Sequence, residues 1–394
     1  MLPIESDTSV NVGPVPLVSV VVPSYNHAKY ISKAVDSILR QGFADFELLI
    51  SDDMSQDNSW DVISGFDDPR IRSFKQEKNL GPVGNLVFLI KQARGKYIAL
   101  LNSDDAWYPS KLGKQVAILE AQPQLGASFT WADLVDDQGR EISGAEAIWN
   151  DVFRQPNRSQ GEWLRHFFFN GNCICHPSML ARKEIYDELG FYNPGLRQLP
   201  DFDMWIRLVK KYPIHIVEEN LVAHLRDGNN TSAVSPENSA RNLTELVEIF
   251  GSFFDGVSDE IFIEGFGKEF RLKGVPPTPA RLQCERLFLL LDSTFAHAAG
   301  RAAGLSLCIK NLTDPEFERV LRDEYMFNVF DFYRLTGQAG FGHYMMHALS
   351  APAPVAGPSV GLGGQGDNLP TLLFRSLRYL KRIARRLVNA VRQN

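Results

Sequence analysis

Residues 18–39 read VSVVVPSYNHAKYISKAVDSIL and carry the signals of a strand, a turn and a helix, in that order. Residues 18–22 are short, continuous and rich in β-branched side chains, which is typical of a strand buried on both faces. After the turn PSYNHA, apolar residues recur at helical spacing until Gly42 ends the pattern; they are Ile31, Ala34, Val35, Ile38 and Leu39. A buried strand that leads directly into a helix is the repeating unit of a parallel α/β sheet.

Two further segments have the composition of buried strands, FELLI at residues 46–50 and YIALL at residues 97–101. Helical patterns separate them, so we expect an α/β, Rossmann-like, mostly parallel sheet with helices on both faces. Residues 52–59 are expected to form a loop and a helix cap. Ligands bind beyond the C-terminal ends of the strands in such sheets. The residues that follow the three strands should therefore share one crevice: Tyr25, Asp52, Asp53, Asp104 and Asp105.

The chain divides by composition into five parts. Residues 1–16 are polar with three prolines and predict a loose arm. Residues 17–232 carry the strand and helix pattern, and residues 233–349 have apolar side chains at helical spacing, which predicts a helical region. Residues 350–370 are rich in Ala, Pro and Gly and predict a flexible linker. Residues 371–394 form a tail.

The bulk properties fit a protein with a substantial core. The chain has 394 residues, 44% of them hydrophobic, and a net charge of −6, which argues against a general nucleic-acid binder. Its four cysteines are too few and too scattered for a disulfide framework. The start MLPIESDTSV lacks the basic region of a signal peptide, and no apolar run reaches the roughly 18 residues of a spanning helix. We therefore expect a cytoplasmic protein.

The tail is strongly basic, because residues 372–394 contain seven Lys or Arg and no Asp or Glu. Apolar residues at steps of three and four define one face of a predicted helix; they are Leu373, Leu377, Leu380, Ala384, Leu387 and Val391. A basic amphipathic helix on a flexible tether is typical of proteins that bind an anionic membrane surface. The alternative is a helix that docks on the acidic body of the protein or on a partner.

The run Asn102, Ser103, Asp104 and Asp105 follows the strand at residues 97–101. Two adjacent acids at this position are costly unless they are paired or bind a cation. Carboxylate oxygens suit Mg²⁺ or Mn²⁺, which take one or two carboxylates together with substrate phosphates. The alternative is a helix cap, in which an Asp starts the helix of AWYPSKL.

Two other acidic segments allow similar alternatives. In SDDMSQD, residues 51–57, a carboxylate can accept from a nucleotide base or a ribose, or the segment is a turn before a helix capped by Asp57. In DFDMWIRL, residues 201–208, Asp201 falls at or before the first turn of a predicted helix, where an acid is favoured. Asp201 is then either a capping residue or a general base that removes a proton from an attacking hydroxyl.

In combination, four segments resemble the family 2 glycosyltransferases with the GT-A fold: residues 18–39, 46–59, 95–112 and 201–208. The resemblance covers roughly residues 17–232. It implies an inverting enzyme that moves a sugar from a nucleotide-sugar, with a UDP-sugar favoured, to a glycan or lipid-linked acceptor. It also implies a divalent cation, Mn²⁺ or Mg²⁺. An enzyme of cell-surface polysaccharide synthesis, bound peripherally at the cytoplasmic face of the membrane, is the resulting expectation.

The resemblance also implies residue roles. Tyr25 packs on the nucleotide base, Asp53 reads the base beside its neighbour Asp52, and Asp104 lies near the ribose. Asp105 binds the metal ion that bridges to the donor diphosphate, and Asp201 is the catalytic base. The full set implied to bind the nucleotide-sugar is Pro23, Tyr25, Asp52, Asp53, Asn85, Asp104, His176 and Asp203.

The chain departs from the family at several positions. Asn102 stands where Asp is frequent, Pro200 where Glu is common, and Asp227 where a metal-contacting His is frequent. His224 is expected to be a structural histidine and not a substitute for that ligand. His176 ends the run CICH, whose spacing does not match a zinc site, and is expected to form a wall of the sugar or acceptor pocket.

Two other functions fit part of this pattern. A sugar-nucleotide pyrophosphorylase-like enzyme needs a Gly-rich, basic phosphate loop after the first strand, and PSYNHA is not one. A non-catalytic scaffold of a glycan-assembly complex is compatible with the departures at Asn102, Pro200 and Asp227.

Overall fold

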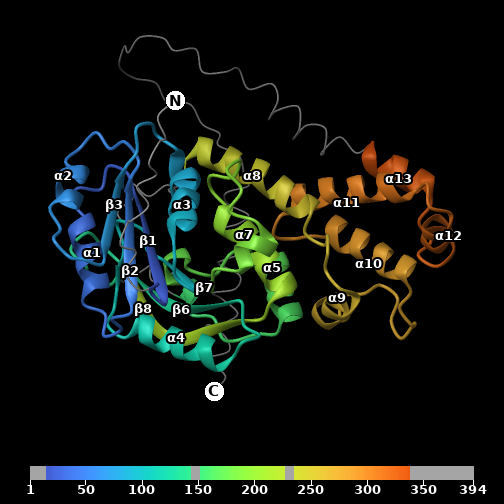
Figure 1. The fold of residues 1–394 in the computed structure, drawn as a ribbon. Coiled ribbons are helices and arrows are strands. Elements are labelled where there is room, and N and C mark those ends of the chain that lie inside the picture. The colour runs from blue at the N-terminus through green and yellow to red at the C-terminus, as the bar shows by residue number, and fades with distance from the viewer. Residues whose placement is uncertain (1–14, 143–150, 227–234, 338–394) are drawn as a thin grey trace, which may run out of the picture. The chain divides into compact units, whose positions relative to one another are not determined.

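An eight-stranded sheet in the order β3-β2-β1-β4-β7-β6-β8-β5 forms the centre of the computed structural model, which describes residues 15–142, 151–226 and 235–337 (Figure 1). The strands are β1 (Val18–Ser24), β2 (Phe46–Asp52), β3 (Ile71–Lys75), β4 (Tyr97–Leu100), β5 (Ala106–Trp107), β6 (Ala127–Val135), β7 (Leu180–Arg182) and β8 (Ile214–Leu225). Strands β5 and β7 pair antiparallel to their neighbours, and the other pairs are parallel. The expected mostly parallel α/β sheet is confirmed.

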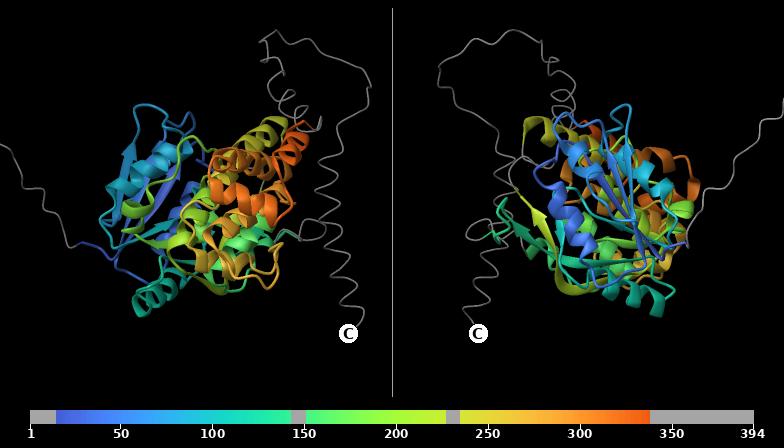
Figure 2. Two further views of the ribbon diagram at one scale, coloured as in Figure 1. Left: turned by 90° about the vertical axis from the view of Figure 1, so that its right-hand side faces the viewer. Right: turned by 60° about the vertical axis from the view of Figure 1, so that its left-hand side comes forward.

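Helices cover both faces of the sheet, as the alternation of side chains along β1 requires (Figures 1 and 2). On one face, Val18, Val20 and Val22 pack with α1 (Ile31–Leu39), α2 (Ser59–Ser64) and α4 (Lys111–Ala121). On the other face, Val21 belongs to the cluster with α3 (Gly81–Gln92), α5 (Gln160–Asn170), α6 (Ile185–Leu189) and α7 (Pro200–Lys211). Of the apolar face expected of α1, Ile31, Ala34, Val35 and Ile38 are fully buried, and Leu39 is partly buried.

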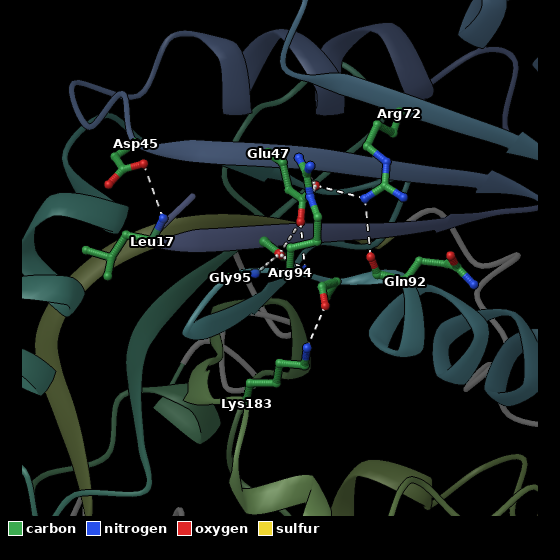
Figure 3. Close-up of polar contacts among 10 residues, drawn as sticks. Leu17, Asp45, Glu47, Arg72, Gln92, Arg94, Gly95 and Lys183 are labelled. Carbon is green, nitrogen blue, oxygen red and sulfur yellow. Dashed lines mark hydrogen bonds and ion pairs between the residues drawn. The ribbon is translucent and has the colours of Figure 1, made fainter. Parts of the chain in front are cut away.

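The N-terminal ends of β1, β2 and β3 are held together by the buried carboxylate of Glu47 (Figure 3). Glu47, 3% exposed, accepts from the Ser19 hydroxyl at 2.7 Å, the backbone N–H of Arg94 at 2.8 Å and the Arg72 guanidinium at 2.9 Å. Arg94 also donates through its side chain at 2.9 Å. Burial opposes the charge, but these donors outweigh it and hold the pKa of Glu47 below its usual value. The network ties β1, β2 and β3 to the turn before β4.

The expected helical region contains α8 (Pro236–Gly251), α9 (Asp259–Phe266), α10 (Pro279–Leu291), α11 (His297–Asn311), α12 (Pro315–Asp323) and α13 (Val329–Thr336). Helices α8 and α9 join the core that covers the sheet, where Phe168 of α5 packs against Phe250, Phe254 and Phe266. Helices α10 to α13 build a smaller core of their own.

Within the described residues, no helix combines the length and the apolar character needed to cross a membrane. Residues 1–14 of the predicted arm, the whole predicted linker at residues 350–370 and the whole predicted tail helix lie outside the described residues.

Candidate active site

The polar segments that follow β1, β2 and β4 meet in space. After β1, the backbone N–H of Asn26 donates to the Ser55 hydroxyl at 2.9 Å, and the Asn26 side chain accepts from the backbone of Gln56 at 2.7 Å. The His27 ring lies 2.7 Å from the hydroxyl of Ser103. These bonds join three loops that are far apart in sequence. The loops at the C-terminal ends of β1, β2 and β4 therefore contact one another, as the sequence predicts.

The turn after β1 presents its aromatic side chain outward. Pro23 and Ser24 close the strand, with Ser51 and Asp52 opposite them in β2. Tyr25 is 43% exposed, whereas the next residue, Asn26, adopts a left-handed backbone conformation with φ 54° and turns the chain toward α1. An exposed ring on a turn held by Asn26 offers a flat surface for a planar ligand.

The acids at the end of β2 are buried and already hydrogen-bonded. Asp52 lies inside the strand and not in a loop, is fully buried, and accepts from the Ser55 N–H at 3.0 Å. Asp53, 2% exposed, accepts from the Leu80 N–H at 2.7 Å, and burial raises its pKa. Asn85, 1% exposed, donates to the Ser51 carbonyl at 3.0 Å. Asp52 and Asn85 thus shape the loop from within.

The acids after β4 have different surroundings. Asp104 is partly exposed and lines a small cavity with Lys29 and Lys33 of the α1 segment. Asp105 has no exposed side-chain surface and is followed by strand β5, while α4 begins only at Lys111. The alternative that Asp105 starts this helix is therefore wrong.

Three donors hold the Asp105 carboxylate. Its Oδ1 lies 2.9 Å from Nδ1 of His224 and accepts from the Leu225 N–H at 2.8 Å, and its Oδ2 accepts from the Asn102 amide at 2.9 Å. Burial lowers the pKa of His224, but Asp105 and Asp104 outweigh this effect and raise it.

The role of His224 beside Asp105 was missed by the sequence argument, which treated this histidine as structural. It lies at the C-terminal end of β8, next to Ala223, whose partner in β5 is Ala106. The rule that site residues follow parallel strands applies to β8 as it does to β1, and that signal was available.

Asp201 lies in the first turn of α7, as expected. Its Oδ2 accepts from the Asn172 amide at 2.7 Å, and its Oδ1 from the Phe202 N–H at 2.8 Å. Burial raises its pKa to about 6, and these two hydrogen bonds limit the rise. A carboxyl group with such a pKa is matched to proton transfer near neutral pH.

The segment that begins at Asn172 lies near Asp201, because Asn172 donates to that carboxylate. Burial raises the pKa of Cys175 well above its usual value, and the charges of Asp105 and Asp201 add to this effect. The Nε2 of His176 lies 3.1 Å from the Tyr192 hydroxyl, and burial lowers the pKa of His176 to about 3. His176 is therefore neutral at physiological pH. All four cysteines are free.

Asp203 faces away from this group. Two residues along a helix point in different directions, and Asp203 makes a two-pronged ion pair with Arg207, at 2.7 and 3.0 Å, that ties α7 to the end of α6. The carboxylate of Asp203 is therefore engaged in an ion pair.

Among the described residues, no group of three or more His, Cys, Asp or Glu is arranged to hold a metal ion. Mn²⁺ and Mg²⁺ need fewer protein ligands where substrate phosphates complete the shell. Asp105 Oδ2 accepts one hydrogen bond, from the Asn102 amide, and a carboxylate oxygen can accept a second partner; the imidazole of His224 binds Oδ1 of the same group. The donor chemistry at Asp105 fits such an ion.

Comparison with known proteins agrees with this geometry. The profile of the family described as "Glycosyl transferase family 2" matches residues 19–190. An uncharacterized glycosyltransferase of Methanocaldococcus jannaschii is 30% identical over 214 residues, which cover 53% of this chain and 70% of that protein. The Escherichia coli enzyme WfaP, a UDP-Glc:alpha-D-GlcNAc-diphosphoundecaprenol beta-1,3-glucosyltransferase, is 37% identical over 198 residues, 50% of this chain and 71% of WfaP.

The fold is that of a solved GT-A structure. The crystal structure of S. aureus TarS 1-349 in complex with UDP aligns with a TM-score of 0.51 at 16% identity, over 73% of this chain and 88% of that one. At this identity the likeness concerns the fold alone.

Proposed function

Because this chain belongs to glycosyl transferase family 2, we propose that it moves a sugar from a nucleoside diphosphate-sugar to a hydroxyl group of a glycan or lipid-linked acceptor. The observation that carries the proposal is a pair of held acids: Asp105 with His224 at the ends of β4 and β8, and Asp201, which Asn172 binds and whose pKa is about 6. Asp105 is suited to hold a cation at the leaving diphosphate. Asp201 is suited to accept a proton from the attacking hydroxyl.

In this proposal Asp201 accepts the proton of the acceptor hydroxyl as the new C–O bond forms, while the bond from the sugar to the diphosphate breaks. Asn172 orients its carboxylate. A base on one face of the sugar and the leaving group on the other require in-line attack, so the sugar is transferred with inversion. Tyr25 packs on the nucleotide base, and Asp53 holds the loop beside it.

Asp105, with His224 beside it, would hold a Mn²⁺ or Mg²⁺ ion. Such an ion stabilises the negative charge that develops on a leaving diphosphate. Asn102 and the Leu225 N–H fix the orientation of the Asp105 carboxylate toward that position. Asp104 is assigned to the ribose.

We favour a UDP-sugar as donor and a lipid-linked glycan as acceptor, because WfaP is named for both. Cell-surface polysaccharide synthesis is the corresponding process. The basic tail at residues 371–394 would hold the enzyme at the cytoplasmic face of the membrane.

The test uses the full-length protein and a panel of UDP-, GDP- and dTDP-sugars, with and without Mn²⁺. Thermal shift identifies the donor, and release of nucleoside diphosphate measures its turnover. Turnover should require Mn²⁺ or Mg²⁺ and should be lost in Asp105→Ala and in Asp201→Asn, with both variants folded by circular dichroism. Undiminished turnover in both variants, or in the presence of EDTA, contradicts the assignment.

A further inference from the structure

The loop before α7 is held by a carboxylate from another region of the chain. Glu245 in the middle of α8 is 6% exposed. Its Oε1 accepts from the backbone N–H of Arg197 at 2.9 Å and of Gln198 at 3.1 Å. Its Oε2 accepts from the N–H of Gln198 at 2.9 Å and of Leu199 at 2.8 Å. Three consecutive backbone donors thus converge on one buried anion.

These three residues decide where α7 begins. Leu199 is the residue that precedes the helix, Pro200 opens it, and Asp201 stands in its first turn. Hydrogen bonds from a backbone to an ionised carboxylate are stronger than neutral ones, so the loop has little freedom to shift. The Gln198 side chain adds a second tie to α8, since it donates to Asn238 at 3.0 Å.

We propose that Glu245 is a positioning residue for the transfer reaction, which holds the first turn of α7 so that the carboxylate of Asp201 meets the acceptor hydroxyl. The inference rests on the function proposed for Asp201 above. It also gives α8 a task in the chemistry, although this helix lies outside the region that resembles the family.

Glu245 acts on Asp201 by charge as well as by position. Its negative charge adds to burial in raising the pKa of Asp201. The other titratable groups around Asp201 are Cys175 and Tyr192, and burial raises the pKa of both well above their usual values, so both are neutral at working pH. Loss of the Glu245 charge should therefore lower the pKa of Asp201.

Glu285 in α10 offers a matched control. It is 2% exposed and accepts from two consecutive backbone donors, the N–H groups of Arg271 at 2.8 Å and Leu272 at 3.0 Å. The Tyr325 hydroxyl donates to it at 2.9 Å. Its chemistry is that of Glu245, but it organises the loop before α10 and acts on no residue of the site.

The experiment compares full-length wild type, Glu245→Gln, Glu245→Asp and Glu285→Gln. The reaction is Mn²⁺-dependent hydrolysis of UDP-glucose and UDP-N-acetylglucosamine, or of whichever sugar of the donor panel is turned over, followed from pH 5 to 8. Glu245→Gln should lower kcat about 10- to 100-fold with little change in the donor KM, because the misplaced group is the base and not a donor contact.

The pH profile separates positioning from stability. In Glu245→Gln the acid limb of the kcat profile should move to lower pH, whereas Glu245→Asp, which keeps the charge, should leave it near that of wild type. Glu285→Gln should lower Tm to a similar degree and leave kcat and the acid limb unchanged. If Glu245→Gln behaves in both respects like Glu285→Gln, the inference is wrong.

The outcome also distinguishes this inference from the proposed function. Full turnover in Asp201→Asn would overturn the function proposed for Asp201 and the inference with it, as would a wild type that hydrolyses none of the donors. Loss of turnover in Asp201→Asn together with a Glu245→Gln variant that matches Glu285→Gln in both kcat and acid limb would overturn the inference alone.

Discussion

Asp201 shows how one side chain can satisfy a structural and a chemical explanation together. It accepts the Phe202 N–H in the first turn of α7, as a residue at a helix start does, and its second oxygen is held by Asn172. Burial keeps its pKa near 6 in spite of these donors. The carboxylate is thus oriented but remains basic enough to take a proton.

The raised pKa of Asp201 predicts a pH-dependent effect of Asp201→Asn on stability. A carboxyl group whose pKa is raised on folding stabilises the fold at low pH, and this contribution is lost as the pH rises through about 6. At pH 7.5 wild type bears the cost of a buried charge that the amide lacks. Asp201→Asn should therefore be more stable than wild type at pH 7.5, by about 1–3 kcal/mol, with a smaller difference at pH 4.

Urea unfolding of both proteins at the two pH values measures this difference. A variant that is less stable than wild type at pH 7.5 and unchanged at pH 4 would show that Asp201 is ionised at little cost, against the environment described for it.

The substitution Tyr25→Ala tests the proposed donor-binding turn with little expected change in the stability of the fold. Its ring is 43% exposed, so Tyr25→Ala removes little buried surface. A stacking contact with a base is worth about 1–3 kcal/mol, so the donor KM should rise roughly 5- to 100-fold while kcat changes little. Donor titrations at saturating Mn²⁺ measure this. Tyr108→Ala, which alters another exposed aromatic residue, is the control and should keep the donor KM.

At the scale of elements, the two ends of the central strands have separate tasks. Their C-terminal ends carry Asp53, Asp105 and the turn of Tyr25, while the opposite edge carries the Glu47 network (Figure 3). The Glu47 network therefore lies at the opposite strand ends from the residues of the proposed site, so a change in the network should leave that site in place.

Glu47→Gln should therefore destabilise the fold without disturbing the site. The amide carries no charge for Arg72 and Arg94, and it cannot accept at both positions of the carboxylate. We expect a loss of about 2–4 kcal/mol at pH 7, less than for a fully buried pair because both arginines reach solvent. The pKa of Glu47 is lowered on folding, so the contribution is present above about pH 4.3 and lost as the pH falls through the folded pKa.

Urea unfolding at pH 7 and at pH 3 measures the effect, with Glu120→Gln as the control. Glu120 pairs with Lys96 near the same edge, but both side chains are about half exposed, so its loss should matter little. Equal stability losses in the two variants would contradict the role given to Glu47.

The elements themselves were largely predictable from local pattern. The strands at residues 18–22, 46–50 and 97–101 and the helix of Ile31 were expected and are present, because fully buried strands and amphipathic helices leave a period in the sequence. Strand β2 extends to Asp52, which the sequence argument placed in a loop. A polar residue at the end of a strand does not extend the hydrophobic pattern of that strand. Only its pairing in the sheet, here with Ser24 and Lys75, shows that Asp52 belongs to β2.

At the scale of the whole molecule, the helical region shares its core with the domain that contains the sheet. Helices α8 and α9 complete the core behind α5 and α7, and α8 supplies Glu245 to the loop before Asp201. The boundary at residue 232 separates a region of alternating strands and helices from a region of helices only. The hydrophobic core contains residues from both sides of this boundary.

The basic tail at residues 371–394 is expected to bind anionic membranes. Full-length protein should float with vesicles that contain anionic lipid, and a protein that ends at Pro370 should not, because it lacks the basic amphipathic segment. Binding should weaken as salt rises, since the lipid attraction is screened. The shortened protein should keep its turnover of a soluble donor. Equal flotation of the two proteins would show that the tail serves another contact.

The sequence alone determined the parallel sheet, the order of its buried strands and the family, because these depend on short periods and on acids placed at strand ends. Only the tertiary structure decided which of those acids are already engaged. Asp105 meets His224 across 119 positions of sequence, and Asn172 reaches Asp201 across 29. No local pattern pairs one of these residues with the other, since strand pairing and helix packing bring them together. The hydrogen bonds that hold Asp52, Asp203, Asp105 and Asp201 exist only in the folded chain.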